Sequence, residues 1–318
     1  MKSVDIVTGL PFTSSSTSFP MPVRKQWDAN YGYCGETSLI MAGMSFGQYT
    51  SQFSARSLAS PGIPQNSEDS QLLLGVNDKL AATKMKLAAL VYKPEVNKKV
   101  SRISGFLSWI NKHIASGHRV IVGLFNKGGN EEEYDHIVPV LGADSKSTET
   151  ILANGNFRGG LTFSDNYGKV FHAPYQAFVK SRSAANRGSS PVYSLPNGTT
   201  NYGIAVTGVL DPDKKTLPVR LSASRNDEPV LSEGANKPPK PAPLKLKATV
   251  SIPDQSKAYR VYYYNSFAKV PDRAFNAAAS NAIRSWTISP HSGPTATFEI
   301  NCLTSDTAIF RAVPLLSA

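Results

Sequence analysis

Cys34 is the residue of this chain whose type and setting most clearly suggest chemistry. It is one of two cysteines and stands directly before Gly35, at the head of a nearly uncharged run. The positive end of a helix dipole lowers the pKa of a thiol and favours the reactive thiolate. Gly35 would leave space beside the sulfur for a substrate carbonyl, and its backbone N–H could serve an oxyanion hole. A packed, inert cysteine explains this residue alone equally well, because free cysteine is among the most buried residue types.

His136 is the best candidate for a base. It opens the segment HIVPVLGAD, which favours a strand, so its ring would project from the end of a sheet. A thiol needs such a base to become a nucleophile. The other histidines flank a helix stripe, follow a helix-ending glycine or lie in loop-like stretches: His113, His118, His172 and His291.

A third group should orient the imidazole from a neighbouring strand. The segment TFSDNYG ends a predicted strand with Asp165 and Asn166. Strand alternation puts Asp165 on the side of Phe163, so Asp165 is the preferred third member and Asn166 the alternative. A turn-forming Asp-Asn pair is the competing interpretation. Cys34, His136 and Asp165, each on the expected kind of element, together indicate a cysteine nucleophile.

The elements that would position these residues are helices first and strands second. A helix is predicted over residues 34–46, apolar on all faces and therefore central and buried. Two more helices are predicted over residues 66–90, capped by Ser67 or Asn66, and 101–117. Strands are predicted over residues 118–125, 136–144, 149–154, 160–165 and 202–210, with a short helix over 173–181. This order predicts an α+β domain with a mostly antiparallel sheet.

After Leu210 the pattern changes to short β-rich segments separated by Pro- and Asn-rich turns. They lie over residues 217–224, 244–252, 258–266, 284–290, 295–303 and 307–314, with one helical pattern over 273–284. We expect a first domain over residues 1–210, beginning with an extended segment over 1–25. Residues 211–318 should form an all-β sandwich of the immunoglobulin-like or fibronectin-like kind. The Pro-rich residues 236–243 could instead be the linker between the domains.

Composition excludes several classes of function. The net charge of +11, from 34 Lys+Arg and 23 Asp+Glu, is spread evenly and predicts no nucleic-acid partner. No apolar run approaches the roughly 18 residues of a membrane span. The N-terminus lacks a convincing signal peptide, yet a secreted protein numbered from its mature end is the preferred expectation, and a cytoplasmic one the second. Export would make the sequon at Asn197 a glycosylation site, although an ordinary polar loop is favoured.

No metal or organic cofactor is predicted. The acidic run over residues 131–133, just before His136, lacks the spacing of metal ligands and is expected to be a solvated loop at the rim of a cleft. No phosphate-binding or dinucleotide-binding loop occurs. Cys302 and the tyrosine cluster over residues 258–266 are expected in the core of the β-sandwich, where outward tyrosines could contact a ligand or partner protein.

The motifs resemble those of the papain-like cysteine peptidases, in particular the branch related to bacteriocin-processing (double-glycine) peptidases. The similar segments are YCGETSLIMAGM, SWINKHIASGHRVIVGLF and HIVPVLGAD. DNYG is similar to the family's Asn-Ser-Trp-Gly stretch, with Asp165 at the place of the Asn. The resemblance covers about residues 25–210. It implies a hydrolase that cleaves amide bonds of peptide or protein substrates through an acyl-enzyme on Cys34, with His136 and Asp165 completing the triad.

One departure from the family concerns the oxyanion hole. The family's Gln before the Cys falls on Asp28 here, and the nearest Gln is Gln26. A bulge in the loop could restore the geometry, and Asn30 is the other available amide. Three other functions are alternatives to a peptidase. The first is a transpeptidase or acyltransferase, because phytochelatin synthases are similar around YCG. The others are a catalytically inactive binding protein and an adhesion or toxin protein whose main function lies in its β domain.

Overall fold

The chain folds as a mixed α+β protein with several antiparallel sheets and few helices. The computed structural model describes residues 2–4, 16–18, 21–93, 102–126, 134–144, 159–185, 193–198, 200–227 and 240–315. The predicted strand over residues 149–154, the acidic run over 131–133, Thr199 of the sequon and residues 236–239 of the Pro-rich segment lie outside the described residues. No helix within the described ranges is long and apolar enough to span a membrane.

The largest sheet carries the strands that were expected around the candidate site. Its strands follow one another in the order β1 (Lys2–Val4), β8 (Val170–Pro174), β7 (Gly160–Ser164), β6 (His136–Asp144), β5 (Arg119–Leu124), β11 (Gly203–Val209) and β4 (Leu87–Val91), and β2 (Ser16–Ser18) also pairs with β6. The antiparallel pairing of β6 with β7 includes Val140 opposite Phe163. This register brings the start of β6 beside the turn that follows β7. The strands predicted over residues 118–125, 136–144, 160–165 and 202–210 are confirmed.

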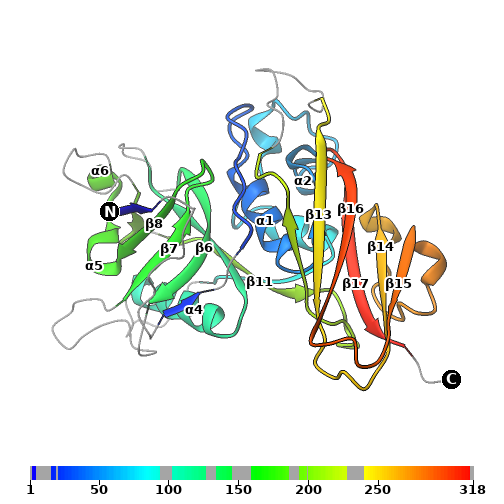
Figure 1. Ribbon diagram of the computed structural model, residues 1–318. Coiled ribbons are helices and arrows are strands. Elements are labelled where there is room, and N and C mark those ends of the chain that lie inside the picture. The colour runs from blue at the N-terminus through cyan, green and yellow to red at the C-terminus, as the bar shows by residue number, and fades with distance from the viewer. Residues whose placement is uncertain are drawn as a thin grey trace.

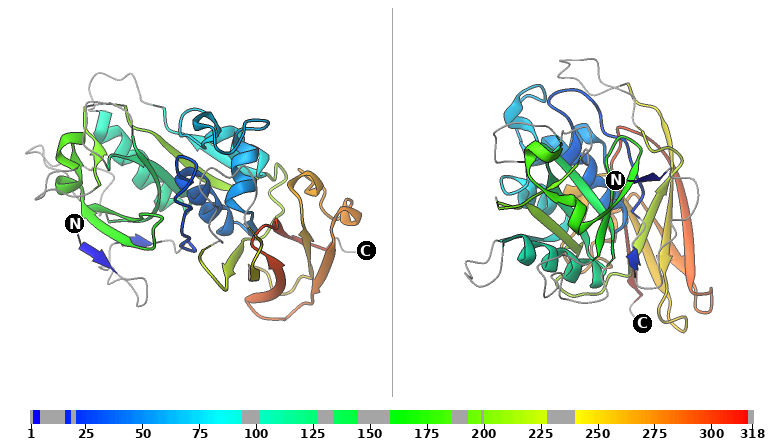
Figure 2. Two further views of the ribbon diagram at one scale, coloured as in Figure 1. Left: turned by 90° about the horizontal axis from the view of Figure 1, so that it is seen from above. Right: turned by 90° about the vertical axis from the view of Figure 1, so that its left-hand side faces the viewer.

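The helix α1 (Cys34–Met44) is buried on all sides, as its sequence predicts. Leu39 and Met41 belong to the same apolar cluster as Ile137 of the large sheet. Ile40 and Met44 belong instead to the cluster formed by the C-terminal strands. Figures 1 and 2 show α1 lying between the large sheet and those strands. A helix with apolar residues on every face is therefore needed here.

The helix α4 (Arg102–Ala115) covers the other face of the large sheet. Its predicted stripe is buried, and Gly117 follows it with a φ of +80°. Alternate residues of β5 separate the two faces: Ile121 packs in the α1 cluster, whereas Val120 and Val122 pack with α4. A short helix, α5 (Tyr175–Phe178), and the parallel pair β9 (Val179–Lys180) and β10 (Leu195–Pro196) extend this side, followed by α6 (Arg182–Ala185) after β9. The helix predicted over residues 173–181 is thus present but shorter.

The single helix predicted over residues 66–90 is wrong. The structure has a 3₁₀ turn, η1 (Glu68–Ser70), then the helix α3 (Asp78–Lys84), and then strand β4. Gly75 and Lys86 adopt φ values of +81° and +55°, which interrupt a right-handed helix on either side of α3. The helix α2 (Gln52–Ala59) was not predicted. The helical pattern over residues 273–284 forms turns and a short 3₁₀ helix, η3 (Ala279–Asn281). Another 3₁₀ helix, η2 (Phe267–Lys269), precedes it.

Two further antiparallel sheets contain the strands predicted after Leu210. One is β12 (Val219–Ala223), β13 (Pro243–Ser251) and β16 (Thr295–Leu303), and the other is β15 (Arg284–Ile288), β14 (Tyr259–Tyr264), β17 (Ala308–Pro314) and β3 (Gln48–Tyr49). Both sheets contribute to one apolar cluster. Strand β3 comes from the segment after α1, with Tyr49 opposite Ala308. The N-terminal part of the chain thus supplies a strand to a C-terminal sheet, and the domain boundary at residue 210 stays a prediction.

Candidate active site

The thiol of Cys34 lies where a buried helix reaches solvent. Cys34 is the first residue of α1, and it is the one residue of this helix that is partly exposed, because Gly35 to Met44 are all buried. The preceding Tyr33 provides no side-chain cap, so it leaves the first backbone N–H groups of α1 uncapped. Cys34 therefore lies at the uncapped start of α1, next to backbone hydrogen-bond donors.

The electrostatic environment of Cys34 differs from the sequence-based expectation. The pKa of the thiol is raised from 9.0 to about 11, chiefly by burial and also by the nearby Glu36 carboxylate. Backbone hydrogen bonds from Ile137 and Gly35, and the charge of Arg56, act in the opposite direction but are weaker. Desolvation thus outweighs the groups that lower the pKa, whereas the sequence led us to expect a lowered pKa. The resting thiol is protonated at neutral pH.

Gly35 has a packing role in place of the expected open space beside the sulfur. A Cβ atom at this position would collide with the backbone carbonyl oxygen of Leu72 and would meet Cδ1 of Ile137 at 3.2 Å. The glycine therefore lets residue 72 approach the start of α1. Any larger residue would push apart α1 and the segment after η1.

His136 is buried at the start of β6, and its ring is fixed by a hydrogen bond. The Nε2 atom lies 2.9 Å from the backbone carbonyl oxygen of Asp165. A carbonyl oxygen only accepts, so Nε2 must carry the proton. In the neutral ring the lone pair then lies on Nδ1, which is the atom that can act as a base.

Two tyrosines cover the faces of the His136 ring. The ring centroids of Tyr167 and Tyr193 each lie 5.7 Å from it, with interplanar angles of 16° and 22°. Burial lowers the pKa of His136, while Asp165 and Asp135 raise it by a smaller amount. The ring is therefore neutral at neutral pH. Cys34 and His136 are thus both uncharged at neutral pH, whereas a thiolate–imidazolium pair would require both to be charged.

Asp165 contacts His136 through its backbone and uses its carboxylate elsewhere. Its Oδ1 atom accepts hydrogen bonds from the backbone N–H groups of Tyr167, at 2.9 Å, and Lys169, at 3.0 Å. The carboxylate thus closes the turn after β7, and this turn presents the carbonyl oxygen that orients the histidine. The two competing interpretations of Asp165, turn former and ring orienter, both apply, although the carboxylate was expected to hold the ring.

Asn166 joins the two elements that carry the thiol and the imidazole. It is buried with a φ of +61°. Its Nδ2 atom donates to the carbonyl oxygens of Cys34, at 3.2 Å, and Ile137, at 2.9 Å, and lies 3.0 Å from Oγ of Ser38. The amide therefore connects the start of α1 to the start of β6. It holds the backbone around the site through contacts with Cys34, Ile137 and Ser38.

The two amides considered for the oxyanion hole are directed differently. Gln26 lies beside the Asp165 turn: its backbone N–H donates to the carbonyl oxygen of Asn166 at 2.8 Å, and its Nε2 donates to the Tyr167 hydroxyl at 2.9 Å. The Nδ2 atom of Asn30 donates to the hydroxyl of Tyr33 at 3.2 Å. Gln26 is thus the amide adjacent to the histidine side of the site.

A buried ion pair holds the loop before Cys34. Arg56 of α2 binds Glu36 with 2.7 Å between Nε and Oε1, and both side chains are at most 1% exposed. The guanidinium also donates to the carbonyl oxygens of Asn30, at 2.7 Å, and Gly32. Residues 30–32 all have positive φ values, between +49° and +86°. Arg56 therefore stabilises a backbone conformation that is unfavourable for two of these three residues.

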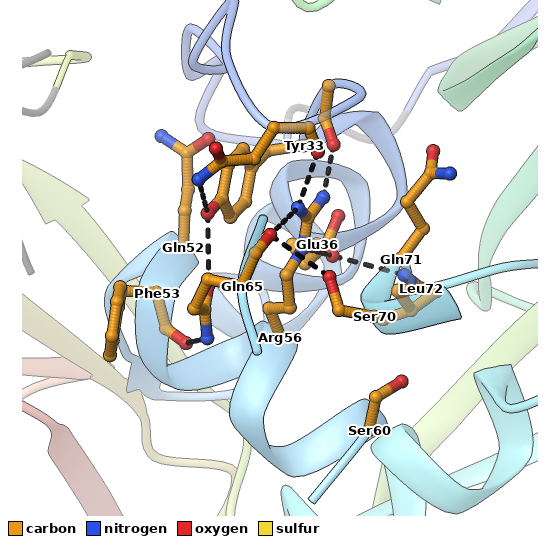
Figure 3. Close-up of polar contacts among 12 residues, drawn as sticks. Tyr33, Glu36, Gln52, Phe53, Arg56, Ser60, Gln65, Ser70, Gln71 and Leu72 are labelled. Atoms are coloured by element: carbon orange, nitrogen blue, oxygen red, sulfur yellow. Dashed lines mark hydrogen bonds and ion pairs between the residues drawn. The ribbon is translucent and has the colours of Figure 1, made fainter. Parts of the chain in front are cut away.

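Further hydrogen bonds connect this network to the rest of the helical layer (Figure 3). Glu36 also accepts the backbone N–H of Leu72 at 3.0 Å, and the Tyr33 hydroxyl donates to Oε1 of Gln65 at 2.9 Å. The Arg56 guanidinium lies 3.6 Å from the centroid of the Tyr33 ring. Gln52, one turn before Arg56, accepts the backbone N–H of Trp27 at 2.9 Å. Both halves of the loop before Cys34 are thus held by α2.

Sequence reasoning missed Arg56, Tyr167 and Tyr193. A signal for Arg56 existed, because Glu36 is the only charge in an otherwise apolar helix, and a buried carboxylate requires a partner. Tyr167 directly follows the residues considered for the third position. Nothing in the sequence connects Tyr193 with His136, because that contact depends on the tertiary fold.

The described part of the chain contains no group of three or more His, Cys, Asp or Glu side chains that could hold a metal ion. Comparison with protein-family models, curated proteins and solved structures found no match to this chain.

Proposed function

We propose that this protein is a papain-like cysteine peptidase that cleaves amide bonds in peptide or protein substrates through a thioester on Cys34. The observation that carries the proposal is the fixed His136 ring, whose Nε2–H is bound to the Asp165 carbonyl while Asn166 holds the Cys34 and Ile137 backbones together. A central helix packed on an antiparallel sheet supports the papain-like interpretation. The C-terminal strands support an immunoglobulin-like or fibronectin-like sandwich as its companion.

The neutral resting pair determines how the first step proceeds. As Sγ of Cys34 attacks the substrate carbonyl carbon, Nδ1 of His136 takes the thiol proton, so the charges form during the reaction. The imidazolium is stabilised by the Asp165 carbonyl and by the negative charges of Asp165 and Asp135. Nδ1–H then protonates the leaving amine, the C–N bond breaks, and the thioester remains on Cys34.

Hydrolysis of the thioester reverses the proton transfer. Nδ1 of His136 removes a proton from water, the hydroxide attacks the thioester carbonyl, and the thiol leaves with the proton that the imidazolium returns. In both steps the carbonyl oxygen becomes negative. Backbone N–H groups at the start of α1 and Nε2 of Gln26 are the proposed donors to this oxygen.

Detection of the acyl-enzyme tests the proposal directly. Incubation with a small panel of activated peptide esters, followed by acid quench and mass spectrometry of the digested protein, should find the acyl group on Cys34. Cys34→Ala should remove the adduct, and Cys302→Ala should not. Acylation of neither cysteine, in protein that is folded by circular dichroism, would favour a binding protein in place of an enzyme.

A further inference from the structure

The Tyr167 hydroxyl can donate a hydrogen bond through its own proton, and the proposed mechanism has no role for this proton. Nε2 of Gln26 lies 2.9 Å from this oxygen, and an amide nitrogen only donates. The tyrosine oxygen is therefore the acceptor, and its own proton is not engaged in this bond. The Tyr167 O–H donates to no acceptor among the described residues. About half of the side chain is exposed, so the proton can reach a bound substrate.

The rest of Tyr167 is held rigidly beside the catalytic pair. Its ring stacks on His136 with a centroid distance of 5.7 Å, and its backbone N–H donates to Asp165 Oδ1 at 2.9 Å. The pKa of the hydroxyl is raised to about 12, chiefly by burial and also by the negative charges of Asp28 and Asp165. The hydroxyl therefore remains protonated and able to donate at neutral pH.

We propose that the Tyr167 hydroxyl is a catalytic residue of the oxyanion hole, which donates a hydrogen bond to the substrate carbonyl oxygen alongside Nε2 of Gln26. The inference rests on the proposed function and specifies how the same site stabilises negative charge. The hydroxyl keeps its proton throughout, because the oxyanion accepts a hydrogen bond and collapses back to a carbonyl without proton transfer. Tyrosine hydroxyls are among the side-chain donors known to serve in such sites.

This role also accounts for the departure at Asp28. The amide expected in the oxyanion hole is two residues further from Cys34 than in the resembling family, and its Nε2 is bound to Tyr167. Each amide nitrogen has two protons, so Gln26 can hold Tyr167 with one and donate the other to substrate. Donation from Gln26 polarises the tyrosine O–H and makes it a stronger donor. Gln26 and Tyr167 therefore act as one unit.

Tyr167→Phe separates this role from the packing of the ring on His136. The variant removes the hydroxyl and keeps the aromatic ring. Three properties should be compared in wild type and variant: kcat for a peptide ester, inhibition by a peptide aldehyde, and the rate of Cys34 alkylation by iodoacetamide. The aldehyde forms a hemithioacetal whose oxygen occupies the oxyanion hole, whereas alkylation forms no oxyanion.

We expect Tyr167→Phe to lower kcat and aldehyde affinity by about tenfold to a hundredfold and to leave the alkylation rate unchanged. Tyr202→Phe, which removes a tyrosine hydroxyl outside the site, is the matched control. An unchanged kcat and aldehyde affinity overturn the inference, as does a parallel loss of all three properties, which would mean that the hydroxyl acts through His136. If wild-type Cys34 binds no aldehyde at all, the proposed function fails, and this inference fails with it.

Discussion

At the scale of single residues, burial keeps two groups of the candidate site uncharged. The thiol of Cys34 has a raised pKa and the imidazole of His136 has a lowered one, so neither charge exists before substrate binds. A preformed ion pair would require the opposite shifts. The mechanism that we propose is therefore general-base activation of a neutral thiol.

The pH dependence of kcat/KM follows from these two pKa directions. His136 must be neutral to act as a base, so activity should rise as the pH increases through its lowered pKa, below 6.5. The thiol titrates only near 11, so activity should then stay level up to about pH 10. A decline already between about pH 8 and 9 would indicate a resting imidazolium and contradict the neutral pair.

Substitutions of Asp165 should reveal that its carboxylate closes a turn. Asp165→Asn keeps an oxygen that can accept from Tyr167 and Lys169, so kcat/KM should fall by about tenfold at most. Asp165→Ala removes the acceptor, which loosens the carbonyl that orients His136, and should cost about a hundredfold or more. Kinetics and thermal unfolding of both variants check this. Equal damage in the two would mean that the negative charge itself is essential.

At the scale of elements, α2 determines the conformation of the loop that precedes Cys34. Gln52 and Arg56 lie one helical turn apart and hold opposite halves of this loop. Glu36 fixes Arg56 from within α1. The loop conformation before Cys34 is thus set by a helix that follows it in the chain.

Glu36→Gln should destabilise the protein strongly, because it leaves the Arg56 charge buried without a carboxylate. Loss of one partner from a buried pair costs about 3–5 kcal/mol of unfolding free energy. Urea denaturation measures this loss, and kcat should fall further than stability alone explains, because residues 30–32 lose their support. The exposed pair of Glu299 and Lys245 provides the control. Glu299→Gln should scarcely change stability, and equal effects of the two substitutions would show that the buried pair has no special role.

The sequence predicted those elements whose apolar pattern matches their environment. The helix at Cys34 and the strand at His136 were found because each has a simple pattern, apolar all round or continuous along a strand. The prediction of a helix over residues 66–90 was wrong because positive φ values at Gly75 and Lys86 interrupt the helix. The spacing of apolar residues does not reveal such backbone conformations. The covering of His136 by Tyr193 depends on tertiary contacts that no local pattern encodes.

At the scale of the whole molecule, the N-terminal and C-terminal parts share their cores. One face of α1 packs on the C-terminal strands, and β3 pairs with β17. Arg311 of β17 is buried and donates to Oε1 of Gln48 at 2.7 Å, and burial lowers its pKa to about 10. Gln48 in turn donates to the carbonyl oxygen of Met85 at 2.6 Å. The C-terminal strands therefore support the helix that carries Cys34.

A chain that ends at residue 210 should consequently fail to fold cooperatively. Truncation would expose Ile40 and Met44 and would remove the β17 partner of β3. Burial of each such side chain contributes about 1.5–3 kcal/mol, so the loss is comparable with the stability of a whole domain. Near-ultraviolet circular dichroism and urea titration of residues 1–210 measure it. A sharp unfolding transition, together with retained Cys34 reactivity, would show that the first part is independent.

Whether His136 activates Cys34 can be measured by the alkylation rates of the two cysteines. Burial raises the pKa of both Cys34 and Cys302 to about 11, so Cys302 is an internal reference for a thiol without a base. Iodoacetamide at neutral pH, followed by peptide mapping, should label Cys34 much faster than Cys302. In His136→Ala the rate at Cys34 should fall to that of Cys302. Equally slow labelling of both thiols in the native wild-type protein would contradict the account.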